Sequence, residues 1–158
     1  MYKRILVAID GSNTSDLALR EAMRLAKDQH AMLRLVHIVD ITPAYTSVEE
    51  PYPFAEYQRA LQEEGEKLLA NRAAMVREAG VESDSKLIII QLFGERIYDA
   101  IEEQSKQWAA DLIVVGTHGR RGVRHLMLGS IAEGVIRVAT KPVLLIRGAS
   151  EEEAKKSA

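Results

Sequence analysis

Apolar and polar residues follow one another along this chain in blocks that predict strands and helices in alternation. Short continuous apolar runs are typical of buried strands, and apolar residues recurring every three or four positions are typical of amphipathic helices. The predicted strands cover residues 4–9, 32–39, 84–92, 111–115 and 143–147, and the predicted helices cover about 14–28, 54–79, 97–108 and 130–140.

This alternation predicts an α/β fold with a parallel sheet and helices on both faces. Each connection between parallel strands must cross over the sheet with right-handed chirality, so successive helices cover one face or the other. A chain of 158 residues with 47% hydrophobic content is the size of one domain with a substantial core. We predict a single doubly wound domain over residues 1–147 and a polar carboxyl-terminal tail over 148–158.

Two helices carry predictions about which face is buried. Apolar side chains in the 54–79 helix mark a face that also contains Gly65, whose cost of about 1 kcal/mol relative to alanine can be offset by close packing. The residues that mark this face are Leu61, Leu68, Met75 and Ala79. In the 130–140 helix the predicted apolar face comprises Ile131, Val135, Ile136 and Val138.

Charge and composition narrow the classes of function. A formal net charge of −2 argues against a broad nucleic-acid-binding or lipid-binding surface. The absence of cysteine excludes disulfides, thiol catalysis and cysteine-ligated metals. No run approaches the ~20 apolar residues that span a bilayer. We therefore expect a cytoplasmic protein that is not an integral membrane protein and does not bind nucleic acid.

A glycine-rich loop stands between the predicted strand 111–115 and the helix that follows it. Its sequence is Gly116-Thr117-His118-Gly119, then nine residues, then Gly129-Ser130. Glycines relieve Cβ crowding, so backbone N–H groups can approach an anion, and a helix amino terminus carries partial positive charge. The loop therefore predicts a phosphate-binding site.

This spacing is similar to the nucleotide-binding signature of the universal stress protein family. Residues 5–12, Ile-Leu-Val-Ala-Ile-Asp-Gly-Ser, resemble the first strand and turn of that family, and the order of elements matches from about residue 3 to residue 147. The resemblance implies a five-stranded sheet in the order 3-2-1-4-5. It also implies membership of the subgroup that keeps the signature and binds ATP.

In such a sheet the ligand crevice lies where crossovers leave in opposite directions, at the carboxyl ends of strands 1 and 4. Asp10 and Gly116 stand at those two ends. The resemblance places Asp10 at the ribose and phosphate side, beside a divalent ion for which Mg²⁺ or Mn²⁺ is suitable, and gives adenine main-chain contacts at Ile38. The predicted binding residues are Ala8, Asp10, Ile38, Val115, Gly116, Gly119, Arg120, Gly129, Ser130 and Ile131, with Asp10 as metal ligand.

Several of these residues also have structural explanations. Ser130 and Glu133 form a capping-box pattern in which the serine accepts a bond from the Glu133 amide, while its own proton remains available to a phosphate. Asp10 can cap the first helix or close a turn with Gly11. Arg120 and its basic neighbours can form a solvated face that also helps to neutralise phosphate.

The resemblance and the motifs favour a nucleotide-dependent regulator over an enzyme. Neither a Walker-type loop nor a kinase signature is present, and His118 has no evident triad partner, so we assign no catalytic residue. A slow ATPase or phosphotransferase, and an adapter that regulates a client such as a membrane transporter, remain alternatives. The apolar edge strand 143–147 predicts a homodimer, and the proline-containing segment 41–53 can act as a lid.

Overall fold

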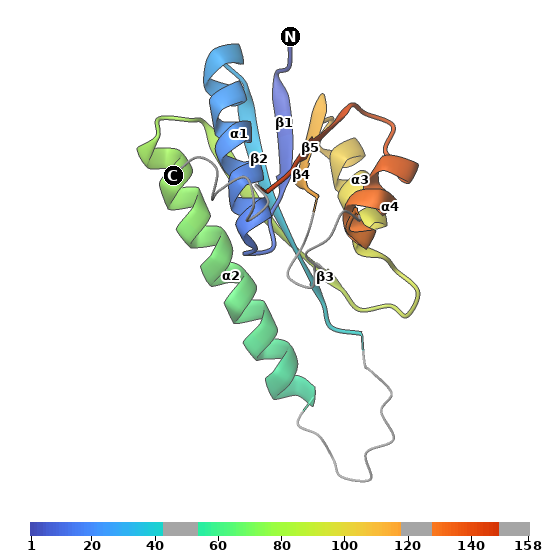
Figure 1. Ribbon diagram of the computed structural model, residues 1–158. Helices are drawn as coiled ribbons and strands as arrows, with labels where there is room; N and C mark the ends of the chain where they lie inside the picture. The colour runs from blue at the N-terminus through green and yellow to red at the C-terminus, as the bar shows by residue number, and fades with distance from the viewer. Residues whose placement is uncertain (43–53, 118–127, 149–158) are drawn as a thin grey trace, which may run out of the picture.

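The computed structural model describes residues 1–42, 54–117 and 128–148. These residues form five parallel strands and four α-helices (Figure 1). The elements are β1 Arg4–Ala8, α1 Asn13–Gln29, β2 Met32–Asp40, α2 Phe54–Glu78, β3 Ser83–Ile90, α3 Ile97–Gln107, β4 Leu112–Gly116, α4 Ser130–Val138 and β5 Val143–Ile146. The strand order is β3-β2-β1-β4-β5, which confirms the predicted fold class.

Helices cover both faces of the sheet, with α1 and α2 on one face and α3 and α4 on the other (Figure 1). Side chains of successive strand residues point to opposite faces. In β1, Ile5 and Val7 pack into the core beneath α1 and α2, and Leu6 packs into the core beneath α3 and α4. The central strands are therefore buried on both sides, which explains their continuous apolar sequences.

The predicted strand 84–92 is too long at its carboxyl end. The strand ends at Ile90, and the Glu95 amide donates to the Leu92 carbonyl in the turn that follows. Gly94 adopts φ +96° in this turn, a left-handed conformation that favours glycine. Leu92 and Phe93 are consequently exposed at the tip of the turn.

The buried stripe of α2 differs from the predicted one. Gly65, Leu69 and Val76 are buried, whereas Met75 is 40% exposed, so its assignment to the apolar face is wrong. Leu61, Leu68 and Met75 are seven residues apart, and a seven-residue spacing drifts by about 20° per repeat on a straight helix. The spacing therefore leaves the sheet-facing side toward the end of the helix.

The predicted close packing at Gly65 is confirmed. A Cβ atom there would lie 2.9 Å from both His37 Cδ2 and Leu87 Cδ1. These distances are shorter than carbon–carbon van der Waals contact. Glycine at this position lets α2 lie directly on β2 and β3.

Helix α4 packs against α3 through small residues. Ala132, Gly134 and Val135 are buried, and a Cβ on Gly134 would stand 2.1 Å from a ring carbon of Tyr98. Ile136 is 48% exposed, so its predicted place on the apolar face is wrong. The spacing of apolar residues alone predicts that Ile136 is buried. The close contact of Gly134 with Tyr98 instead places Ile136 on the side of α4 that faces away from α3.

Trp108 lies near the amino ends of the strands. The guanidinium carbons of Arg4 and Arg34 stand 4.7 and 4.8 Å from the centre of its ring. Both arginines belong to the amino-terminal parts of β1 and β2. The tryptophan is therefore at the opposite end of the sheet from the strand ends where the ligand crevice is predicted.

Within residues 1–42, 54–117 and 128–148, no helix has the length and apolar character that crossing a bilayer requires.

Candidate functional site

The carboxyl ends of three neighbouring strands meet at the centre of the sheet. Val7 lies opposite Val114, and Ala8 lies opposite Val36. Continuing these registers places Ala8 level with Val115 and Asp10 level with Ile38. The structure thus brings together the predicted residues of β1, β2 and β4.

The turn after β1 is held by a network of short-range hydrogen bonds. The Ser12 amide donates to Asp10 Oδ1 over 2.9 Å, and the Asp10 amide donates to Ser15 Oγ over 3.3 Å. Gly11 between them has φ +81°. Asp10 therefore closes the turn, which is one of its two structural explanations.

Ser12, rather than Asp10, caps helix α1. Its Oγ accepts from the Ser15 amide over 3.2 Å. Capping by Ser12 leaves Asp10 one turn before the helix, at the end of β1. The carboxylate is thereby fixed by the turn at the place where the crevice is predicted.

The main chain of Ile38 faces the space beyond the end of β1. In β2 the Val36 carbonyl accepts from the Ile9 amide, and the Ile41 amide donates to the Ile90 carbonyl of β3. Because peptide groups of alternate residues point to opposite neighbours, the N–H and C=O of Ile38 point to the β1 side. There β1 has already ended at Ala8.

Gly116 has a packing role that the sequence does not reveal. A Cβ atom there would lie 2.8 Å from the Thr14 carbonyl carbon and 2.9 Å from its oxygen. Both atoms belong to the backbone of the first turn of α1 and cannot rotate away. Glycine at the end of β4 is therefore required for the close approach of α1, independently of any anion.

The two ends of the glycine-rich loop are joined. The Thr117 amide donates to the Ile146 carbonyl over 2.9 Å, and the Gly129 amide donates to the Thr117 carbonyl over 2.7 Å. The loop therefore leaves and returns at the carboxyl end of β4. The Gly129 amide is used in this closure.

Helix α4 starts one residue earlier than the capping-box pattern predicts. Gly129 is the N-cap residue, and its carbonyl, not the Ser130 hydroxyl, accepts from the Glu133 amide over 2.9 Å. The capping-box prediction for Ser130 is thus wrong, because Gly129 already has the extended conformation of a cap. Ser130 is the first residue of the helix and is exposed. The amides of Ser130 and Ile131 belong to the first turn, where an α-helix offers no internal acceptors.

Gly119 and Arg120 lie outside the described residues, as do His118 and the other basic residues of the loop. The same is true of residues 43–53 of the predicted lid. The roles proposed for these residues therefore remain predictions.

His37 is a residue of this region that sequence reasoning passed over. Its ring is buried, and Nδ1 lies 2.8 Å from the Ile9 carbonyl oxygen, so it joins β2 to the end of β1. A histidine inside an otherwise apolar strand was the signal that could have identified it. Its ring also contacts the position of Gly65, so α2 holds it in place.

Among the described residues, Asp10 has no further carboxylates or histidines grouped with it as a preformed metal cage. In the described ranges, no group of three or more histidine, aspartate and glutamate side chains could hold a metal ion. Asp16, in the first turn of α1, is engaged with Arg72 of α2 over 2.7 and 2.9 Å. A metal at Asp10 would therefore need ligands other than the side chains of the described residues.

Comparison with known sequences identifies the family of this chain. The sequence model of the universal stress protein family matches residues 1–147. The chain belongs to this family. Universal stress protein YxiE of Bacillus subtilis is 36% identical over 153 residues, which cover 93% of this chain and all of that one.

Solved universal stress proteins have the same fold. UspA from Lactobacillus plantarum superposes with a TM-score of 0.79 at 25% identity and covers 92% of this chain and 98% of its own. A universal stress protein from Archaeoglobus fulgidus in complex with dAMP gives a TM-score of 0.65 at 25% identity, with the same two coverages. The second protein is similar to this universal stress protein and binds an adenine nucleotide.

Proposed function

We propose that this universal stress protein binds ATP and acts as a nucleotide-dependent regulator in the stress response of the cytoplasm. The observation that carries the proposal is the convergence of the ends of β1, β2 and β4 with the amino terminus of α4. An open parallel sheet binds ligands at this kind of switch point. The adenine nucleotide bound by the Archaeoglobus relative supports the choice of ligand class.

Each part of the nucleotide has a partner in this arrangement. The main chain of Ile38, which faces the space beyond β1, suits the edge of an adenine ring. Asp10 suits the ribose and phosphate side, and the first-turn amides at Ser130 and Ile131 suit the phosphates. Gly119 and Arg120 complete the proposed phosphate site.

A divalent cation fits this donor set when ATP is bound. Mg²⁺ commonly takes one or two protein carboxylates together with phosphate oxygens and water. Asp10 supplies one carboxylate, held by the turn through its bond with the Ser12 amide. Mn²⁺ suits the same donors.

ATP is proposed to act as a conformational ligand rather than a substrate. Hydrolysis requires a group that orients or deprotonates water. Asp10 is committed to its turn and to the proposed cation, and the His37 ring is buried and held at the Ile9 carbonyl. Binding groups that act equally on ground and transition states raise affinity without accelerating reaction.

The outer edge of β5 is proposed to pair with a second copy of the chain. β5 is the end strand of the sheet, and its four residues are all only partly buried. The Pro142 and Ile146 carbonyls accept bonds from β4, so the peptide groups of Val143 and Leu145 point away from the sheet. An unpaired apolar edge of this kind favours pairing.

Isothermal titration calorimetry with ATP tests the nucleotide site. Asp10→Asn should weaken binding about tenfold or more in Mg²⁺, and should change it little in EDTA, because the carboxylate acts mainly through the cation. Asp28→Asn, an equal charge change at the far end of α1, is the matched control. Absence of ATP binding by the wild-type chain would refute the proposal.

Single-turnover hydrolysis separates the regulator from the slow-ATPase alternative. The regulator reading predicts that ATP bound to the protein with Mg²⁺ persists far longer than the ~0.1 s expected at a median enzymatic rate. A rate of order 1 s⁻¹ that is lost in His118→Ala while binding is retained would establish an enzyme instead.

A further inference from the structure

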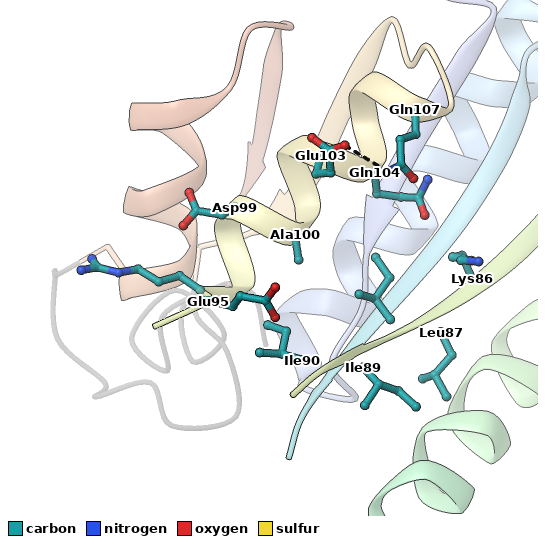
Figure 2. Close-up of a pocket in the computed structure, with 12 residues that line it drawn as sticks. Lys86, Leu87, Ile89, Ile90, Glu95, Asp99, Ala100, Glu103, Gln104 and Gln107 are labelled. Atoms are coloured by element: carbon teal, nitrogen blue, oxygen red, sulfur yellow. Dashed lines mark hydrogen bonds between the residues drawn. The ribbon is translucent and has the colours of Figure 1, made fainter. Parts of the chain in front are cut away.

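A second concave surface lies away from the nucleotide site, between β3 and α3. It has a volume of about 470 Å³ and is partly open to solvent. β3 is the end strand of the sheet, separated from β1 by β2. Figure 2 shows this groove, with α3 along one wall and β3 along the other.

The outer edge of β3 offers a row of peptide groups. The Glu82 and Ile90 carbonyls accept from the Leu33 and Ile41 amides of β2 and its continuation. Peptide groups of alternate residues point to opposite neighbours. The N–H and C=O groups of Ser85, Leu87 and Ile89 therefore point outward, where the described residues supply no further strand.

The floor of the groove is apolar. Ile88 packs on the face of the sheet that carries α3, whereas Leu87 packs on the face that carries α2. Ile88 and Ile90 therefore present side chains to the groove side, and Ala100 of α3 lines the facing wall. Helix α3 packs mainly over β2 and α4, and Ile88 on this side of β3 is only partly buried.

The wall of the groove also carries an uncharged polar side chain. Gln104 of α3 is only 5% exposed and lines the groove. Figure 2 shows Gln104 on the part of α3 that borders the groove. Its amide carries both donors and an acceptor, so it can hydrogen-bond to a chain that lies in the groove.

The charges along α3 indicate what kind of ligand this is. Glu95, Asp99 and Glu103 line the groove, and none of them joins the ion pairs formed between described residues. The guanidinium of Arg96, a cation at the same wall, is hydrogen-bonded to the Tyr98 hydroxyl over 2.5 Å. Lys86 is the other cation at the groove, so carboxylates predominate.

The spacing of the carboxylates matches that of an extended chain. Asp99 and Glu103 are four residues apart on one helix, a rise of about 6 Å. Alternate side chains of a β-strand, which project to the same face, are about 6.6 Å apart. A strand laid along β3 would therefore place every second side chain opposite one carboxylate of α3.

We propose that the groove between β3 and α3 binds an extended segment of a partner protein, which pairs with the outer edge of β3 as a sixth strand. Lysine or arginine at alternate positions of the segment faces Glu95, Asp99 and Glu103, and a polar group of the segment bonds to the Gln104 amide. Main-chain bonds give affinity in this mode of recognition, and the alternate side chains give specificity. The surface is separate from the nucleotide site, so its occupation does not depend on the proposed function.

The test uses a fluorescein-labelled peptide of alternating residues, acetyl-Lys-Thr-Lys-Thr-Lys-Thr-Lys-amide, titrated with the full chain in the absence of nucleotide. Fluorescence anisotropy should show saturable binding, and the same peptide with glutamate in place of lysine should not bind. The triple variant E95Q/D99N/E103Q should bind the lysine peptide about tenfold or more weakly.

A matched triple variant excludes a general effect of charge. E56Q/E63Q/E78Q removes three exposed carboxylates of α2 and should bind within about twofold of wild type at equal ionic strength. Equal weakening in both triple variants, or no binding of the lysine peptide to wild type, would overturn the proposal.

Strand pairing is tested separately from charge. Ser85→Pro removes one outward N–H of β3 while leaving the bonds to β2 in place, a substitution that an edge strand tolerates. It should weaken binding about fivefold or more, with circular dichroism unchanged. If this variant does not fold, N-methylation of alternate peptide nitrogens replaces it. Binding that survives both the substitution and the N-methylation would refute pairing with β3.

Discussion

Replacement of Gly116 by alanine tests whether this glycine serves packing or anion binding. The new Cβ would stand 2.8 Å from the Thr14 carbonyl carbon. Normal contact between carbon atoms is about 3.5 Å, so the first turn of α1 or the end of β4 must move by about 0.7 Å. Overpacking of this kind costs about 1–3 kcal/mol, and the higher end applies because the atoms belong to the backbone.

Part of this cost is offset because alanine loses less conformational freedom on folding than glycine does. Alanine stabilises a strand interior by about 0.5–1 kcal/mol relative to glycine. The free energy of unfolding should therefore fall by about 2 kcal/mol, and Tm should fall by about 4–8 °C. Urea unfolding without nucleotide, followed by fluorescence of the buried Trp108, measures the change.

Gly148→Ala is the matched control for this experiment. Its Cβ would lie 3.0 Å from Thr14 Cγ2. This atom is a side-chain methyl group of Thr14, whereas Gly116 faces the Thr14 backbone. That methyl group can move, so the variant should lose less than about 0.5 kcal/mol. A Gly116→Ala protein as stable as wild type would refute the packing role, and loss of ATP binding alone would restore the anion-binding explanation.

Three further predictions follow from the fold and the proposed assembly. Gly65→Ala gains about 1 kcal/mol of helix propensity but should still lower the free energy of unfolding measured in urea. The new Cβ would press on the His37 ring, which cannot move away because it is held by its bond to Ile9. A stabilised variant would contradict the packing of α2 at this position. Light scattering should show that the wild-type chain is a dimer. Leu145→Pro should dissociate the dimer without changing the circular dichroism spectrum, because it removes one outward N–H of β5. A monomeric wild type at micromolar concentration would refute the edge pairing. Trp108 fluorescence should change little when ATP is added, because its ring lies at the amino ends of the strands, and a large quench would contradict the position of the site.

The sequence predicts the elements of this fold well because the central strands are buried on both faces. Runs such as 111–115 are apolar throughout, and their length separates them from helices. The strand order, by contrast, came from the family resemblance, since no local pattern specifies which strands are neighbours. The crossovers then bring Asp10 and Gly116 together without further information.

The errors arose where tertiary packing decides what the local pattern leaves open. Ser130 has the sequence of a cap, yet the extended Gly129 takes that position. Met75 follows a seven-residue spacing that leaves the buried face. The packing role of Gly116 depends on the backbone of Thr14, about one hundred residues earlier in the chain, so no local reading could reveal it.

Mapping of backbone amide shifts on addition of ATP and Mg²⁺ tests the central claim most directly. We predict the largest shifts at residues 8–12, at Ile38 and at residues 129–131, where three strand ends and the amino terminus of α4 converge. The β3 and α3 amides that line the peptide groove should change little. ATP-induced shifts concentrated in that groove, or at the amino ends of the strands, would contradict the account.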